Sequence, residues 1–161
     1  MLEDIVENVI GHESSADVVT GFEVLEHVHD PLDFVRVLKG LARLGGYVCV
    51  STLCIDGFDL QMLWEKSTQI SPPHHINFLS VRGFEKLFAR AGLEEVVVTT
   101  PGQLDVDIVR NTADRDPGIL ADHRFVQAVL ARDSTRARFQ EFLSANQLSS
   151  HAWITGRRVE G

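Results

Sequence analysis

The chain of 161 residues has little cysteine and no long apolar run. Cys49 and Cys54 are its only cysteines, and they form neither a CxxC motif nor a set of metal ligands, which favours a reduced protein. No stretch approaches the roughly 20 apolar residues of a membrane span, and the acidic start MLEDIVENVIG does not resemble a secretory signal. We therefore expect a cytoplasmic protein that has no membrane partner.

Basic residues are also in the minority. Fifteen lysines and arginines stand against 23 aspartates and glutamates, which gives a formal net charge of −8. Nucleic-acid binding needs a basic footprint, so this balance argues against nucleic acid as a partner. With 44% hydrophobic residues, the chain suits one globular domain with a real core.

The spacing of apolar residues predicts an α/β fold. Residues 16–22 (ADVVTGF) and 47–52 (YVCVST) are short and nearly continuous in apolar character, as strands buried on both faces are. Between them Asp30-Pro31 can start a helix, and Gly45-Gly46 can end it. A strand, a helix and a strand in this order predict a βαβ unit with parallel strands.

Periodicity predicts the remaining elements of a single domain over 1–161. These are an amino-terminal helix or linker over 1–15, a helix over 84–92 capped by Ser80, a strand over 94–100, an extended or irregular stretch over 104–111, helices over roughly 119–131 and 134–146, and a last strand over 151–155. Residues 104–147 thus form an insertion, mostly helical, before the last strand.

Polar residues gather where the first predicted strand ends. Glu23, Glu26, His27 and His29 lie in GFEVLEHVHDP, residues 21–31. In an open parallel sheet, ligands bind beyond the carboxyl ends of the strands, because loops there carry side chains on a rigid support. The cluster therefore indicates a ligand site.

These pieces, in this order, resemble class I methyltransferases that use S-adenosylmethionine, in particular the branch that acts on small molecules. The matching pieces run from about Asp17 to Arg158: DVVTGFEVLEHVHDP, LARLGGYVCVST, PPHHINFLS, FEKLFARAGLE, LDVDIVRN and SSHAWITGRR. The resemblance implies a partial Rossmann-like sheet, with strands equivalent to the family's fourth, fifth, seventh and sixth, and flanking helices. It implies the carboxyl-terminal half of that fold.

The family's glycine-rich cofactor loop has no counterpart in the sequence. Gly11 is the sole glycine before Gly21, and the 16 residues upstream of Asp17 are too few for the missing βα units, since one βαβ unit takes ~30 residues. We therefore expect a truncated methyltransferase-like domain that does not act alone and that needs the missing amino-terminal half or a second copy. The alternative is a non-catalytic interaction or oligomerisation module.

The resemblance also implies residue roles. It places Phe22, Glu23, Val24, Leu25 and Glu26 along the S-adenosylmethionine cleft. It places His27 near the transferred methyl group, where an imidazole can act as general base toward a substrate hydroxyl. The competing interpretation is that Leu25 is core and that Glu26 caps or pairs locally.

A metal site is a second interpretation of the same segment. Glu23, Glu26 and His27 share one face if the segment turns helical, and two carboxylates with an imidazole suit a divalent ion. Some quinone-pathway O-methyltransferases look similar here, with an acidic and histidine cluster proposed to hold magnesium. Ligand distances are needed to decide between the two interpretations.

The stretch SPPHHINFLS, residues 71–80, is the second candidate. Its prolines force extended backbone before His74, and in the resembling family this loop lies over the substrate side of the cleft. His74 and His75 are therefore candidate catalytic residues, although a histidine here can also simply bond a backbone carbonyl. Residues 58–67 can be a lid over an apolar substrate or part of the core.

A hydrolase is the outside alternative, because His74-His75 and Asp30 can be imagined as a metal pair. Ser149, Ser150 and His151 lie together near the last strand. No GxSxG or HExxH motif supports a hydrolase, and triads are recognised by geometry rather than by sequence.

Overall fold

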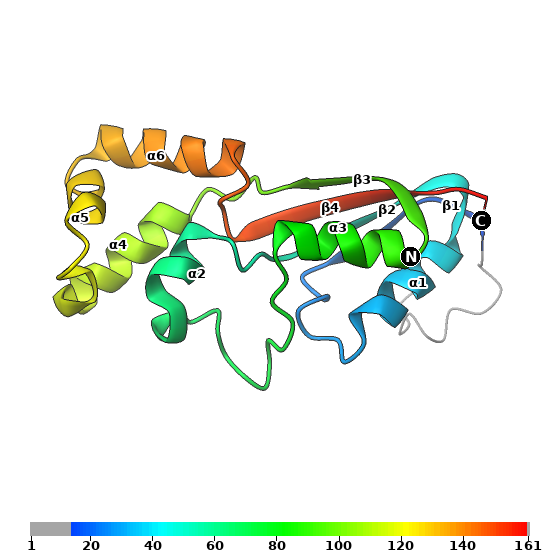
Figure 1. Ribbon diagram of the computed structural model, residues 1–161, viewed down its shortest axis with the longest axis horizontal. Helices are drawn as coiled ribbons and strands as arrows, with labels where there is room; N and C mark the ends of the chain where they lie inside the picture. Colours follow the sequence, from blue (N-terminus) through cyan, green and yellow to red (C-terminus); the bar gives the residue numbers. More distant parts are fainter. Residues whose placement is uncertain (1–13, 161) are drawn as a thin grey trace.

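The computed structural model describes residues 14–160, which form a four-stranded sheet, two helices on one face of it and a helical layer at one end (Figure 1). The predicted amino-terminal helix or linker over 1–15 lies almost wholly outside these residues. No helix in the described part of the chain is long and apolar enough to cross a membrane.

The sheet has the strand order β1-β2-β4-β3. Its strands are β1 (Ala16–Phe22), β2 (Ala42–Leu53), β3 (Leu93–Thr99) and β4 (His151–Arg158). β1 and β2 are parallel, whereas β4 inserts antiparallel between β2 and β3. This confirms the order that the resemblance implied.

Two helices, α1 (Pro31–Leu41) and α3 (Val81–Arg90), cover one face of the sheet and lie in front of it in Figure 1. Both predicted caps are present: Asp30 Oδ1 accepts from the amides of Leu32 and Asp33, and Ser80 Oγ accepts from the amide of Gly83. The core between helices and sheet contains, among others, Leu38, Val48, Val50, Phe84, Phe88 and Ile154.

The predicted end of α1 at Gly45-Gly46 is wrong. The helix ends at Leu41, and both glycines lie within β2. The Arg158 guanidinium donates to the carbonyls of Lys39, Gly40 and Ala42, so a side chain from the last strand satisfies the helix end in place of a glycine cap. Gly46 is needed for a different reason, since a Cβ there would come within 3.0 Å of the carbonyl oxygens of Ala16 and Asp17.

The opposite face of the sheet has no helix over it in residues 14–160. Its large side chains, which are 38% to 56% exposed, are Val18, Phe22, Tyr47, Val97 and Trp153. The pairing register places Val18 beside Tyr47 and Ser51 beside Trp153, so these residues share one face. β1 is in addition an edge strand. The described residues thus leave a face and an edge of the sheet open.

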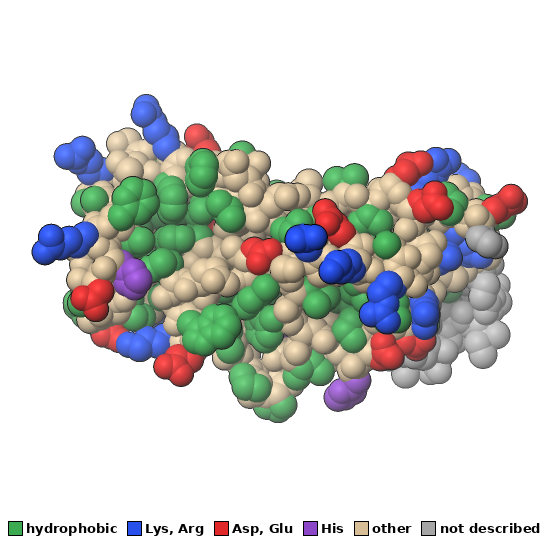
Figure 2. Space-filling model, in the orientation of Figure 1, with side chains coloured by type: hydrophobic (Ala, Val, Ile, Leu, Met, Phe, Trp, Pro, Cys, Tyr) green, Lys and Arg blue, Asp and Glu red, His purple; other side chains and the backbone are tan. Residues whose placement is uncertain are grey.

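The helical layer lies at one end of the sheet and has its own core (Figure 1). Its elements are α2 (Phe58–Leu63), η2 (Trp64–Lys66), α4 (Asp105–Arg115), η3 (Pro117–Leu120), α5 (Arg124–Leu130) and α6 (Asp133–Ala145). Figure 2 shows hydrophobic side chains gathered over α5 and α6, where Phe125 is 71% exposed and Phe142 51% exposed. Ring contacts link both of them to Phe139.

The extended or irregular conformation predicted for residues 104–111 is wrong, because Asp105–Arg115 form α4. The alternation in LDVDI suggests a strand, yet the buried positions Val106 and Val109 are three apart, which is a helical spacing. The first turn is fixed by distant groups: Gln140 Oε1 accepts from the amide of Val106, and the Asp105 carboxylate accepts from Ser150. Local sequence does not carry those contacts.

A pair of buried carboxyl groups joins the helical layer to the sheet. Asp105 accepts from Ser149 Oγ at 2.6 Å, from Gln140 Nε2 at 2.7 Å and from the amide of Ser150 at 2.6 Å. Asp59 on α2 is fully buried, and within the described residues no well-aligned hydrogen bond reaches its oxygens, although the Ser150 side chain and the Leu60 amide lie close enough to favour its charged form. Burial, with the charge of Asp105 added to it, raises the pKa of Asp59 from 3.8 to about 6.

This buried carboxyl group makes stability depend on pH. The folded state binds the Asp59 proton more tightly than the unfolded state, so the free energy of unfolding falls as pH rises from about 4 to about 6. Asp59→Asn removes the charge, and we expect it to raise the free energy of unfolding by up to about 3 kcal/mol at pH 8, with little difference from the native protein at pH 4. Urea denaturation at both pH values measures this difference.

Asp107→Asn, at a half-exposed position on the same layer, is the control and should change stability little at either pH. An Asp59→Asn effect of equal size at pH 4 and pH 8 would contradict the assignment of the penalty to ionisation.

Candidate active site

The polar cluster begins where β1 ends. Glu23 takes a left-handed backbone conformation, with φ of 51°, and its amide donates to the carbonyl of Ser51 at the end of β2. The Ser51 hydroxyl donates in turn to Glu23 Oε1 at 2.6 Å. Backbone and side chain together therefore hold Glu23 against the neighbouring strand.

Glu26 is a buried carboxylate, only 2% exposed. Its Oε2 accepts from the hydroxyl of Thr52, which is also buried, at 2.8 Å. The backbone carbonyl of Glu26 accepts from the amides of Ile76 and Asn77, and the Asn77 side chain donates to the carbonyls of Leu25 and Val28. These bonds attach the loop over residues 71–80 to the turn after β1, although some 50 residues separate them.

The attachment brings His27 and His75 together, with ring centroids 4.8 Å apart. His27 Nδ1 lies 2.7 Å from the carbonyl oxygen of His74, and His75 Nδ1 lies 2.6 Å from that of Gln69. A carbonyl oxygen only accepts, so each Nδ1 carries a proton, and in the neutral ring each Nε2 keeps its lone pair. Both histidines thus present a basic nitrogen in a fixed orientation.

A metal ion can use these donors. One ligand atom from each of Glu26, His27 and His75 lies within 4.8 Å of the others, and no other such group of three occurs in residues 14–160. Metal-binding histidines commonly donate their second ring N–H to a backbone carbonyl, as both do here. The structure therefore groups His75, rather than Glu23, with Glu26 and His27.

The other predicted site residues lie in different surroundings. Phe22, Glu23 and Val24 are exposed at the sheet's carboxyl edge, whereas Leu25 is 1% exposed and part of the core. The ring of His74 is exposed, and its carbonyl orients His27.

Residues 58–67 and the serine and histidine run leading into β4 lie in mixed surroundings. Leu60 and Leu63 are buried while Trp64 is 57% exposed, so residues 58–67 contain both core and surface positions. Ser149 donates to Asp105 and His151 faces Glu23, so the two side chains have separate partners rather than forming a triad.

Several residues around the cluster were not predicted as site residues, namely Thr52, Asn77 and Trp153, and His151 was considered only as part of a serine and histidine run. Alternation in HAW places His151 and Trp153 on one face of a strand, which is a usable signal. Nothing local indicates that this face meets Glu23.

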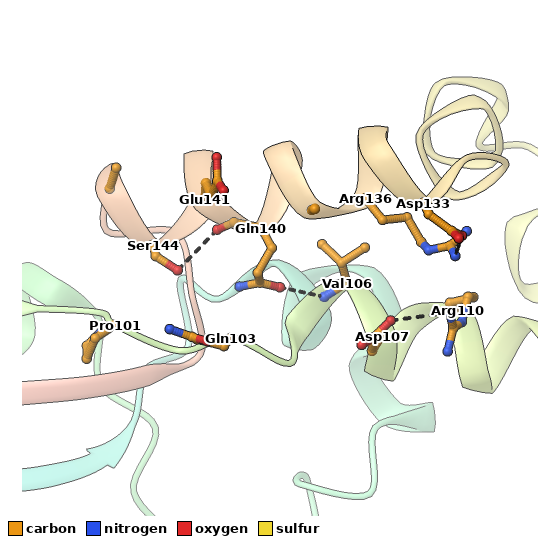
Figure 3. Close-up of a pocket in the computed structure, with 12 residues that line it drawn as sticks. Pro101, Gln103, Val106, Asp107, Arg110, Asp133, Arg136, Gln140, Glu141 and Ser144 are labelled. Atoms are coloured by element: carbon orange, nitrogen blue, oxygen red, sulfur yellow. Dashed lines mark hydrogen bonds and ion pairs between the residues drawn. The ribbon is translucent and has the colours of Figure 1, made fainter.

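A cavity of about 770 Å³ lies apart from this cluster, between α4 and α6 (Figure 3). Its lining shares no residue with the histidine cluster: Pro101, Gln103, Val106, Asp107, Arg110, Asp133, Arg136, Ala137, Gln140, Glu141, Ser144 and Ala145. Arg110 and Arg136 are paired with Asp107 and Asp133, so the cavity offers little unpaired charge.

Residues 5–98, more than half of the chain, match the family model of a methyltransferase domain. The chain belongs to the class I S-adenosylmethionine-dependent methyltransferases. Curated relatives include ubiquinone biosynthesis O-methyltransferases of Escherichia coli and Shigella boydii, each 44% identical over 55 residues. That match covers 34% of this chain and spans 23% of the relatives' length.

Solved structures of other proteins share the fold of this chain. A possible histamine N-methyltransferase of Thermotoga maritima is 15% identical with a TM-score of 0.59, covering 98% of this chain and 62% of that chain. The YcgJ protein of Bacillus subtilis is 20% identical with a TM-score of 0.52, covering 97% and 69%. Phosphoethanolamine N-methyltransferase 2 of Haemonchus contortus, in complex with S-adenosyl-L-methionine, is 12% identical with a TM-score of 0.55, covering 92% and 34%.

Removing the hydrogen bond between Thr52 and Glu26 tests how much this bond contributes to stability. Thr52→Val keeps the shape but removes the donor, so the buried Glu26 Oε2 is left without its partner. We expect the free energy of unfolding to fall by about 2 kcal/mol, whereas Thr52→Ser, which keeps the hydroxyl, should lose less than about half of that. Urea denaturation measures both, and equal losses would show that the bond contributes little.

Proposed function

We propose that this chain provides the acceptor side of a methyltransferase that transfers a methyl group from S-adenosylmethionine to a small molecule. The main support for this proposal is the pair of imidazoles, His27 and His75. A backbone carbonyl orients each ring at Nδ1, and Nε2 makes no hydrogen bond within the described residues. They lie just beyond the end of β1, where an α/β sheet binds its ligands.

The histidines suit one step of methyl transfer. S-adenosylmethionine, when bound, supplies a methyl group on a sulfonium that leaves as a thioether. An acceptor hydroxyl must lose its proton during attack, and His27 or His75 Nε2 can take it as general base. The buried Glu26 carboxylate beside the rings stabilises the imidazolium that forms.

The exposed residues at the end of β1 and directly after it suit part of the cofactor. Glu23 offers a carboxylate for a cationic group, and Phe22 and Val24 offer apolar surface. Leu25 belongs to the packing beneath them. Residues 14–160 contain no glycine-rich loop after a strand, so we propose that another polypeptide segment completes the site.

The open edge and face of the sheet support this proposal. Among residues 14–160 no strand pairs with the outer edge of β1, and apolar surface is exposed across all four strands at Val18, Phe22, Tyr47, Val97 and Trp153. Such an edge and face invite pairing with another chain. The segment that covers them is either an amino-terminal methyltransferase half or a second copy of this chain. A module that only associates, without catalysis, is the alternative.

Cofactor binding should therefore accompany association. We expect the monomer to bind no S-adenosylhomocysteine and the associated form to bind it in the micromolar range. Calorimetry across a range of chain concentrations, matched with sedimentation of the same samples, measures this. Micromolar binding by the monomer would contradict the need for a second segment, and association without binding would favour the interaction module.

A divalent ion is the second candidate ligand, favoured by the convergence of Glu26, His27 and His75. Such an ion would orient an acceptor hydroxyl and lower its pKa. We expect His75→Ala to weaken Mn²⁺ binding at least tenfold. His74→Ala, which removes an exposed ring but keeps the carbonyl that orients His27, should leave binding unchanged.

Titration calorimetry with Mn²⁺ checks this pair of variants. Equal effects of His75→Ala and His74→Ala, or no Mn²⁺ binding by the native chain, would exclude a metal at these three residues.

A further inference from the structure

A second histidine contact lies on the open face of the sheet, at Glu23. His151 Nδ1 lies 3.5 Å from Glu23 Oε1, and the indole Nε1–H of Trp153 donates to His151 Nε2 at 2.9 Å. All three side chains are partly exposed, so water and ligands reach them.

The strand register explains this convergence. Trp153 pairs directly with Ser51 across β4 and β2, and His151 is two residues earlier on the same face of β4. Glu23 reaches the same point from the end of β1, since Ser51 holds both its amide and its Oε1. The ends of β1, β2 and β4 thus bring Ser51 and His151 close to the same carboxylate oxygen, Oε1 of Glu23.

The tautomer of His151 follows from its partners. An indole nitrogen only donates, so His151 Nε2 must be the bare acceptor and Nδ1 must carry the proton. Nδ1 lies 3.5 Å from Glu23 Oε1, which is close to the carboxylate but longer than an ordinary N–H···O hydrogen bond. The indole ring of Trp153 is itself packed against Phe22, with ring centroids 5.4 Å apart, which holds its N–H in place.

We propose that His151 is a positioning residue for Glu23, held by Trp153 in the Nδ1–H tautomer so that it donates to the carboxylate. The Ser51 hydroxyl donates to Oε1 and the His151 Nδ1–H lies beside the same oxygen, so Oε2 stays available for a cationic group of a ligand. The inference rests on the proposed function in one respect, which is that the ligand is S-adenosylmethionine, whose amino group is such a cation.

Nuclear magnetic resonance of the ¹⁵N-labelled chain tests the tautomer directly. Long-range ¹H–¹⁵N correlations distinguish a protonated from a bare ring nitrogen, and the His151 signals are those that disappear in His151→Asn. We expect the native chain to show Nδ1 protonated and Nε2 bare. Trp153→Phe keeps a ring against Phe22 but removes the donor, so the Nε2–H form should appear.

An Nε2–H form in the native chain, or the same tautomer in Trp153→Phe, would overturn the proposal. Neither result depends on whether a cofactor binds.

Affinity for S-adenosylhomocysteine in the associated protein tests the effect on Glu23. His151→Ala removes the donor and should weaken binding about tenfold, which is what a lost hydrogen bond to a charged group implies. His151→Asn places an amide N–H near the position of Nδ1 and should restore affinity to within about threefold. Equal affinities of the native protein and His151→Ala would exclude a positioning role.

If the native protein binds no S-adenosylhomocysteine in any state of association, the proposed function fails. The tautomer measurement then still decides whether Trp153 and His151 hold Glu23.

Discussion

The insertion of β4 between β2 and β3 is the constraint on which the rest of the structure depends. The first residues of β4 and the serines before it contact both layers of the molecule: Ser149 and Ser150 donate to Asp105 in the helical layer, and His151 faces Glu23 at the end of β1. The last residue of the strand, Arg158, satisfies the carbonyls at the end of α1. One strand near the carboxyl terminus therefore positions elements from the whole described chain.

The hydrogen-bond partners of the histidines at the carboxyl end of the sheet determine which ring nitrogens carry a proton. Carbonyl oxygens of Gln69 and His74 determine which nitrogens of His75 and His27 stay basic. A side-chain donor, the Trp153 indole, gives His151 the same Nδ1–H tautomer, but there Nε2 already accepts from the indole and Nδ1 lies near a carboxylate. The two arrangements offer a ligand different groups. His27 and His75 present the Nε2 lone pairs, whereas His151 lies beside the Glu23 carboxylate, which is the acceptor.

The buried carboxyl groups of Glu26 and Asp59 differ in their hydrogen bonding. Glu26 accepts a well-aligned hydrogen bond from the Thr52 hydroxyl, whereas Asp59 has no such bond within the described residues and burial raises its pKa to about 6. Burial of an unpaired charge costs free energy unless the group takes up a proton. The contact between the helical layer and the sheet therefore weakens as pH rises through the range where Asp59 ionises.

Several elements were predictable because their signals are local. The apolar run of β1, the Asp30 and Ser80 caps and the strand over 151–155 depend on neighbours in sequence, and the polar cluster after β1 stands out for the same reason. The end of α1 and the helical state of Asp105–Arg115 were predicted wrongly, because Arg158, Gln140 and Ser150 decide them from far along the chain.

The sequence by itself determined the α/β class, the family and the candidate histidines, since these rest on periodicity and on short ordered motifs. Only the tertiary structure decided that His75, not Glu23, stands with Glu26 and His27, and that Glu23 meets His151 instead. The physical reason is that hydrogen bonds over about 50 residues attach one loop to another, and that strand register chooses which side chains share a face.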